Sequence, residues 1–145
     1  MKTQIVLTVN GSSREAMEFY ANIFHVDYNM VTYGEIPPDP NQPLNESDKD
    51  KIAWGNMKIG DLKINFGDSL TDLPFTSGNN ITLHLNVEGA EEVTRIFNAL
   101  KIGGDVSENL REEFFADIYG KVTDKFGVSW NILGLGPIAY ENANN

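Results

Sequence analysis

Short stretches in which apolar and polar residues alternate recur along the chain, and a period of two is typical of β-strands with one buried face. In the first half of the chain the predicted strands span residues 3–9, 27–34, 52–59 and 62–68. The last two are separated only by Gly60-Asp61, a pair that is common in hairpin turns. The pattern therefore predicts four strands before residue 69, the last two of them as a hairpin.

A helix is predicted between the first two strands. Ser12 and Glu15 have the spacing of a capping box, in which each side chain bonds a free backbone N–H at the start of a helix. Apolar side chains follow at helical spacing, namely Ala16, Phe19, Tyr20, Ile23 and Phe24. Farther on, residues 36–50 hold four of the six prolines, which predicts a surface loop between the second and third strands.

The same order of elements returns after a connector at residues 69–79. A strand is predicted at 80–87, then a helix at 89–101 that ends at Gly103-Gly104, then three strand-like pieces that reach Leu133. The chain thus holds a βαβββ unit twice, and neither half has enough strands to bury both faces of a sheet alone. We expect an α+β fold in one domain of residues 1–145. Its tandem modules, at about 1–68 and 80–134, should form curled mixed sheets around a cavity, and the tail 137–145 should be loose.

The two faces of each predicted strand differ in polarity. In the strand after the connector, Leu83 and Leu85 belong to the apolar face, whereas Thr82, His84 and Asn86 belong to the other. The polar faces carry mostly neutral groups, while a solvated face usually carries more lysine and glutamate. This favours an enclosed polar trough between the sheets. The alternative is an ordinary antiparallel sheet with one solvated face.

Composition and net charge limit the classes of partner and the location expected for this chain. With 21 acidic and 11 basic residues the net charge is −10, and such a chain repels phosphate backbones, so nucleic-acid binding is not expected. The absence of cysteine excludes disulfides, zinc–thiolate sites and cysteine nucleophiles, and it fits a reducing compartment. We find no signal-peptide pattern and no apolar segment of membrane-spanning length, and we expect a cytoplasmic protein without membrane contact.

Two segments resemble a known family. Residues 10–28, NGSSREAMEFYANIFHVDY, are similar to the opening strand–turn–helix signature of the vicinal-oxygen-chelate (glyoxalase/bleomycin-resistance/dioxygenase) superfamily, with His25 in place of the usual glycine. Residues 112–130, EEFFADIYGKVTDKFGVSW, resemble the PhnB-like branch, with Phe115 where that pattern usually has tryptophan. The resemblance covers roughly residues 3–134. It implies the glyoxalase/bleomycin-resistance fold and a homodimer, and it leaves the reaction open because the superfamily hosts many activities.

The resemblance also implies where a metal would be held. Metal-dependent members place one ligand on the first and last strand of each module, and the corresponding positions here are Gln4, Asn65, Thr82 and Asn131. Divalent ions favour imidazole, thiolate or carboxylate ligands, whereas these positions offer three carboxamides and a hydroxyl. Trp54 also stands where PhnB-like relatives often carry a histidine. We therefore expect no metal and no cofactor.

Three further residues are candidates for the ligand site. His84 shares the polar face with Thr82 and is either a hydrogen-bonded structural residue, a general base or a ligand. Trp54 and Phe115 are aromatic groups that would stack on a planar molecule, although a core or interface role is the alternative for Trp54. Asp124 is interpreted as a turn former that bonds its own backbone.

These observations favour a small-molecule-binding protein without a metal. The alternatives are a metal-dependent lyase, isomerase or dioxygenase of the same superfamily, and a metal-free enzyme that uses His84 as its base.

Overall fold

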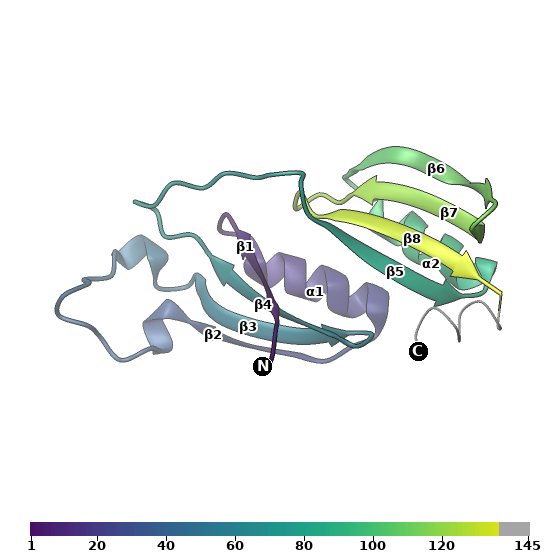
Figure 1. The fold of residues 1–145 in the computed structure, drawn as a ribbon. Helices are drawn as coiled ribbons and strands as arrows, with labels where there is room; N and C mark the ends of the chain where they lie inside the picture. Colours follow the sequence, from purple (N-terminus) through teal and green to yellow (C-terminus); the bar gives the residue numbers. More distant parts are fainter. Residues whose placement is uncertain (137–145) are drawn as a thin grey trace. The chain divides into compact units, whose positions relative to one another are not determined.

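The computed structural model describes residues 1–136, and the expected loose tail at 137–145 lies outside the described residues. The chain divides into two compact units, each treated by itself: the first spans Met1–Thr76 and the second begins at Ser77. Figure 1 follows the order of elements along the chain. Within residues 1–136 neither helix is long and apolar enough to cross a membrane.

The first unit is a four-stranded mixed sheet with one helix. Its elements are β1 (Ile5–Val9), α1 (Ser13–Phe24), β2 (Tyr28–Thr32), β3 (Ile52–Ile59) and β4 (Leu62–Asp68), with short 3-10 helices at Tyr33–Glu35 and Glu46–Asp48. The strand order is β1-β4-β3-β2, in which only β1 and β4 run parallel. Both hairpin strands have the predicted bounds.

The second unit repeats this topology. Its elements are β5 (Thr82–Glu88), α2 (Ala90–Leu100), β6 (Asp105–Glu113), β7 (Ala116–Thr123) and β8 (Ser129–Leu135). The order β5-β8-β7-β6, with β5 and β8 parallel, matches that of the first unit. The predicted α+β fold of tandem βαβββ modules is confirmed. Within residues 1–136 both sheets are open, since each outer strand is hydrogen-bonded on one side only. The cavity that the sheets were expected to surround stays a prediction.

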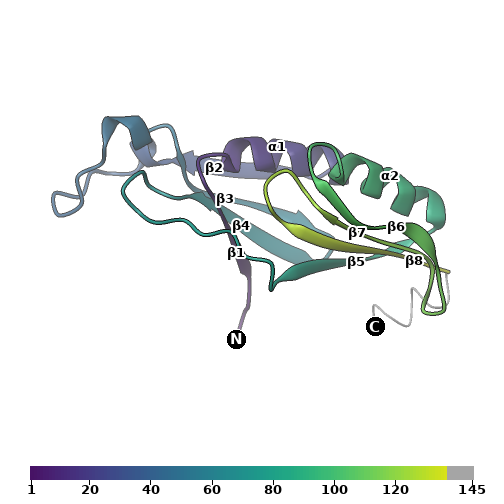
Figure 2. The same cartoon turned by 90° about the horizontal axis from the view of Figure 1, so that it is seen from above.

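Each helix covers one face of its own sheet, as Figures 1 and 2 show. The apolar sets of the strands lie on that face: Ile64 and Phe66 under α1, and Trp130 and Ile132 under α2, are all at most 1% exposed. The opposite face of each sheet, which carries the polar sets, is called the open face below. The predicted division of the strands into two faces is confirmed.

A glycine at the same place in both modules lets each helix approach its sheet. In the register of the strands, Gly55 pairs with Phe66 as Gly120 pairs with Ile132. A Cβ at Gly55 would lie 2.6 Å from the side chain of Met17, and one at Gly120 would lie 2.8 Å from the ring of Phe97. A side chain at either position would force these neighbours to shift, so the two modules share a close helix–sheet contact as well as their strand order.

The first helix begins where predicted, but the predicted capping of its N-terminus is wrong. Ser12 is the N-cap, but its side chain makes no capping hydrogen bond, and no capping box forms with Glu15. Instead the backbone N–H of Ser13 donates to Asp68 Oδ1 at 2.9 Å, a bond across 55 residues. A carboxylate at the end of β4 therefore satisfies the helix N-terminus, and local sequence spacing does not reveal such a long-range cap.

Candidate functional site

The positions predicted for the ligand site lie on the open faces of the two sheets, except Phe115 in the hairpin between β6 and β7. Gln4 and Asn65 lie together in the first unit, where Asn65 Nδ2 donates to Gln4 Oε1 at 2.7 Å. Trp54 lies on the same face and is 46% exposed. In the second unit His84 pairs in register with Asn131, and Thr82 pairs with Ser129.

A row of four residues crosses the open face of each sheet at equivalent positions. In the first unit the row consists of Val6, Asn65, Asn56 and Asn29. In the second unit it consists of His84, Asn131, Lys121 and Glu108. The same backbone positions therefore present a valine and three carboxamides in one module, and an imidazole, an amide, an ammonium and a carboxylate in the other.

The row in the first unit is closed by its own hydrogen bonds. Asn65 donates to Gln4, and Asn56 Nδ2 donates to Asn29 Oδ1 at 2.9 Å. Each of these amides has a partner on the sheet itself, which lowers what a ligand would gain by replacing it.

The row in the second unit is left open at its centre. The Oδ1 atom of Asn131 is buried and accepts no hydrogen bond within residues 1–136. A buried acceptor without a partner costs about 1–3 kcal/mol, so a donor on a bound molecule would be favourable at this position. On one side of Asn131, His84 Nε2 lies 3.2 Å from Asn86 Oδ1. On the other side, Lys121 Nζ lies 4.0 Å from Glu108 Oε1.

The open face of the second sheet becomes apolar next to this row. Tyr119 lies two residues before Lys121, and it belongs to a buried cluster with Ala116, Leu133 and Leu135. Phe115 meets the edge of Tyr119 with ring centroids 5.2 Å apart, and it is itself 45% exposed. The face thus carries hydrogen-bonding groups at its centre, a buried apolar cluster beside them and the exposed ring of Phe115 at its border, a mixture of polar and apolar groups that is common in small-molecule sites.

A charged cluster borders the aromatic surface. The guanidinium carbon of Arg111 lies 5.7 Å from the ring centroid of Tyr119. Arg111 Nε donates to Glu113 at 2.7 Å and Nη2 donates to Glu108 at 3.0 Å. These carboxylates, Glu113 foremost, raise the pKa of the guanidinium, which stays charged and held over the ring.

The positions that would bind a metal do not fit a divalent cation. Gln4, Asn65, Thr82 and Asn131 offer only neutral oxygen and nitrogen atoms, and Asn65 and Gln4 already bond to each other. Within residues 1–136 no three His, Asp or Glu side chains gather where they would hold an ion. Neutral donors would not offset the loss of the ion's water shell.

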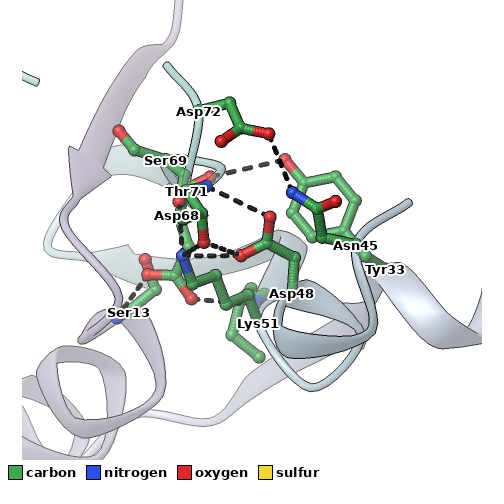
Figure 3. A network of polar contacts seen from close by, with 10 residues as sticks. Ser13, Tyr33, Asn45, Asp48, Lys51, Asp68, Ser69, Thr71 and Asp72 are labelled. Atoms are coloured by element: carbon green, nitrogen blue, oxygen red, sulfur yellow. Dashed lines mark hydrogen bonds and ion pairs between the residues drawn. The ribbon is translucent and has the colours of Figure 1, made fainter. Parts of the chain in front are cut away.

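Carboxylates in the first unit support the fold (Figure 3). Asp68, 6% exposed, accepts the N–H of Ser13 and that of Ile52, the latter at 2.8 Å. Asp48, 1% exposed, accepts both the N–H and the hydroxyl of Thr71 and pairs with Lys51 Nζ at 2.8 Å. Hydrogen bonds from Lys51 and Thr71 lower the pKa of Asp48 to about 2. This network fastens the end of the loop at 36–50 to the segment after β4.

Asp124 has the predicted role of a turn former, with one addition. Its Oδ1 accepts the N–H of Phe126 at 2.9 Å and that of Val128 at 3.1 Å. Its Oδ2 also accepts the indole N–H of Trp130 at 2.9 Å, in the interior of the second unit. Asp124 is therefore a structural residue.

Sequence reasoning placed Asn86 on the polar face with Thr82 and His84, but it did not single out Tyr119 or Lys121 as site residues. Tyr119 belongs to the Tyr119-Gly120 motif, and Lys121 follows two residues later on the same face. Counting by twos from the motif would have placed both beside Asn131.

Comparisons with known proteins agree with this architecture. The sequence model of the family described as 3-demethylubiquinone-9 3-methyltransferase matches residues 1–133. Protein YjdN of Escherichia coli K12 is 30% identical over 133 residues, which cover 87% of this chain and 90% of that protein.

Solved structures give the same result. Protein PA1353 of Pseudomonas aeruginosa superposes with a TM-score of 0.82 at 30% identity, covering 93% of this chain and 99% of that one. The PhnB protein of Bacillus cereus, described as a putative 3-demethylubiquinone-9 3-methyltransferase, gives a TM-score of 0.73 at 25% identity, covering 92% and 98%. The fosfomycin resistance protein FosX of Listeria monocytogenes shares the fold alone, with a TM-score of 0.64 at 13% identity over 96% and 95% of the chains.

Proposed function

Since this chain belongs to the family described as 3-demethylubiquinone-9 3-methyltransferase, the PhnB-like branch of the vicinal-oxygen-chelate superfamily, we propose that it binds a small organic molecule without a metal. The site is the open face of the second sheet, around Asn131, His84, Tyr119 and Phe115. The Oδ1 of Asn131 carries the proposal, because it is buried and accepts no hydrogen bond within residues 1–136, so that a donor on a bound molecule would satisfy it.

The combination of polar and apolar side chains on this face supports an amphipathic ligand. Polar contacts would come from Asn131, His84 and Lys121, and apolar contacts from Tyr119 and Phe115. The aromatic rings supply contact area at a low cost in side-chain entropy, and the polar groups orient the molecule.

Nuclear magnetic resonance tests the location of the site. In a titration of the ¹⁵N-labelled protein with a library of small hydroxylated and aromatic compounds, binders should shift the Asn131 side-chain amide and the backbone amides of Tyr119 and Phe115. The Asn65 side-chain amide in the first unit serves as the internal reference and should move less. A library that leaves the second unit unchanged at millimolar concentration would remove this site from consideration.

The absence of a metal requirement has a separate test. Zinc, nickel or iron should raise the melting temperature by no more than about a degree. A specific ion at a hundredfold above its Kd would add about 2.7 kcal/mol, which is several degrees for a domain of this size. An increase of several degrees that a chelator abolishes would contradict metal-free binding.

We also propose a cytoplasmic homodimer. Within residues 1–136 the outer strands of both sheets have one unpaired edge each, and apolar residues on or next to β1 and β5 are accessible, with Val6 at 63% and Ile81 at 65% exposed. Edge strands in this state favour pairing with another copy. Light scattering should give about 32 kDa, twice the chain mass of 16.1 kDa. A value near 16 kDa at micromolar concentration would rule the dimer out.

A further inference from the structure

The turn between β1 and α1 contains an asparagine that is followed by a glycine. Asn10-Gly11 is the one place in the 145-residue chain where an Asn or Asp precedes a Gly. Asn10 is exposed, and its side chain makes no hydrogen bond among residues 1–136. Gly11 adopts φ 77°, and a Cβ built there would meet nothing within 4 Å. The pair therefore lies in an open turn, where no other side chain shields it.

An asparagine in this setting can lose its side-chain amide without an enzyme. The backbone nitrogen of the next residue attacks the side-chain carbonyl carbon, and ammonia leaves with the proton of that nitrogen, so that a succinimide ring forms. Water then opens the ring at either carbonyl. One product is aspartate, and the other is isoaspartate, in which the chain continues through the former side chain. Glycine favours ring closure because it has no Cβ and its backbone rotates freely.

One hydrogen bond of the native turn opposes this reaction. The N–H of Gly11 donates to Val9 O at 2.9 Å, and its nitrogen attacks only when that bond opens. The bond closes a turn of three residues at an exposed position, where local opening costs little compared with unfolding of the whole unit. The turn therefore slows ring closure without preventing it.

The same turn joins three elements of the first unit. Val9 O accepts the N–H of Gly11 and, at 3.2 Å, the N–H of Ser69, the residue after β4. Two residues after Gly11, the N–H of Ser13 donates to Asp68 at 2.9 Å. Isoaspartate adds one atom to the backbone of residue 10, which shifts α1 relative to the end of β1 and weakens these contacts. Aspartate leaves the backbone unchanged, and its charge near the start of α1 is favourable.

We propose that Asn10-Gly11 is a site of spontaneous deamidation, and that isoaspartate at residue 10 loosens the attachment of α1 to β1 and β4. The reaction needs only water and adds one negative charge to the modified chain. It does not involve the open face of the second sheet, so it is independent of the ligand site. Molecules that carry isoaspartate are less stable than newly made ones, and the turn thereby limits the lifetime of the folded protein.

Peptide mapping by mass spectrometry tests the site in the full-length protein during incubation at pH 8 and 37 °C. The peptide that contains Asn10 should lose its unmodified form, and fragment ions should identify both aspartate and isoaspartate at residue 10. Asn79 and Asn80, which are exposed between β4 and β5 but precede no glycine, are the internal reference and should stay unmodified over the same time. Conversion of Asn10 no faster than theirs would overturn the assignment, and so would conversion without isoaspartate.

The effect on the fold is measured on the same samples. The fraction with isoaspartate, separated by ion-exchange chromatography, should melt several degrees below the fresh protein. Freshly prepared Asn10→Asp should differ from it by no more than about two degrees, as expected for an exposed substitution. Asn10→Gln, whose longer side chain closes a ring less readily, should keep its melting temperature through the same incubation. Equal melting of the isoaspartate form and Asn10→Asp would overturn the proposed loosening of α1, and so would an equal loss in Asn10→Gln.

Discussion

The two units share a backbone plan and differ in what their open faces do. Asn65 and Asn131 hold the same place in the two repeats, each opposite the parallel first strand of its sheet. The amide of Asn65 donates to Gln4, and that of its neighbour in the row, Asn56, donates to Asn29. Among residues 1–136 the Oδ1 of Asn131 instead is buried and accepts no hydrogen bond, and its neighbours in register are an imidazole and an ammonium. The same backbone position is therefore satisfied by side chains of the sheet in one module and not in the other.

The internal polar networks differ in the same way. In the first unit Asp68 and Asp48 connect α1, β3 and the loop at 36–50 to the segment after β4. In the second unit the buried carboxylate of Asp124 accepts the N–H of Phe126 in its own turn and the indole N–H of Trp130. Polar contacts between segments far apart in the sequence thus stabilise the first unit.

The largest effect is expected for Asp68→Ala. The substitution leaves the N–H groups of Ser13 and Ile52 buried without an acceptor, and each loss of a bond to a charged group costs about 1.5–3 kcal/mol. We expect the free energy of unfolding, measured by urea denaturation, to fall by about 4 kcal/mol. Asp72→Ala removes an exposed bond to Asn45 and should change it by no more than about 0.5 kcal/mol. Equal losses in the two variants would mean that burial of the carboxylate is unimportant.

Asp48 gives the first unit a defined dependence on pH. Its pKa is about 2 in the folded protein and 3.8 as the ordinary value, so the carboxylate stabilises the fold above about pH 4. That contribution is lost as the pH falls from about 4 to 2. Asp48→Asn should therefore melt below the unaltered protein at pH 7, and the gap should narrow towards pH 2.

The control for this pH dependence is Glu46→Gln, which removes an exposed ion pair with Lys49 in the same loop. Exposed pairs contribute little, so its melting temperature should follow the unaltered protein at every pH. A gap for Asp48→Asn that stays constant from pH 7 to 2 would show that charge at this position is not the cause.

The ends of the two helices offer a smaller contrast. Helix α1 ends at His25, which adopts φ 54° in the left-handed region, whereas the turn after α2 uses Gly103 at φ 73°. The left-handed conformation costs a residue with a Cβ about 1–2 kcal/mol. Glycine avoids this cost, but it loses more conformational entropy on folding, which offsets part of the gain. His25→Gly should raise the free energy of unfolding by about 0.5–1 kcal/mol in a urea titration. Gly103→Ala should lower it. A loss of stability in His25→Gly, or a gain in Gly103→Ala, would contradict this account of the helix ends.

The sequence predicted the repeated fold well because each strand and helix shows its own period, as residues 52–59 and 62–68 do. It also placed His84 and Asn131 on one face, since alternation decides the face of a strand. It did not predict that Asp68 caps α1, because the two groups lie 55 residues apart and meet only in the folded sheet. Nor did it predict that the side chains of Asn65 and Asn131 differ in hydrogen bonding. Asn65 bonds to another side chain, whereas the Oδ1 of Asn131 has no partner among residues 1–136.

The most direct test of this account is the free energy of unfolding of two matched variants, Asn65→Leu and Asn131→Leu. Asn65→Leu loses an exposed bond to Gln4, whose amide then bonds to water, so it should cost about 0.5 kcal/mol. Asn131→Leu removes a buried acceptor that has no partner, so stability should stay the same or rise by up to about 1 kcal/mol. A loss for Asn131→Leu as large as that for Asn65→Leu would mean that Asn131 supports the fold, and the claim that the second unit reserves it for a ligand would be wrong.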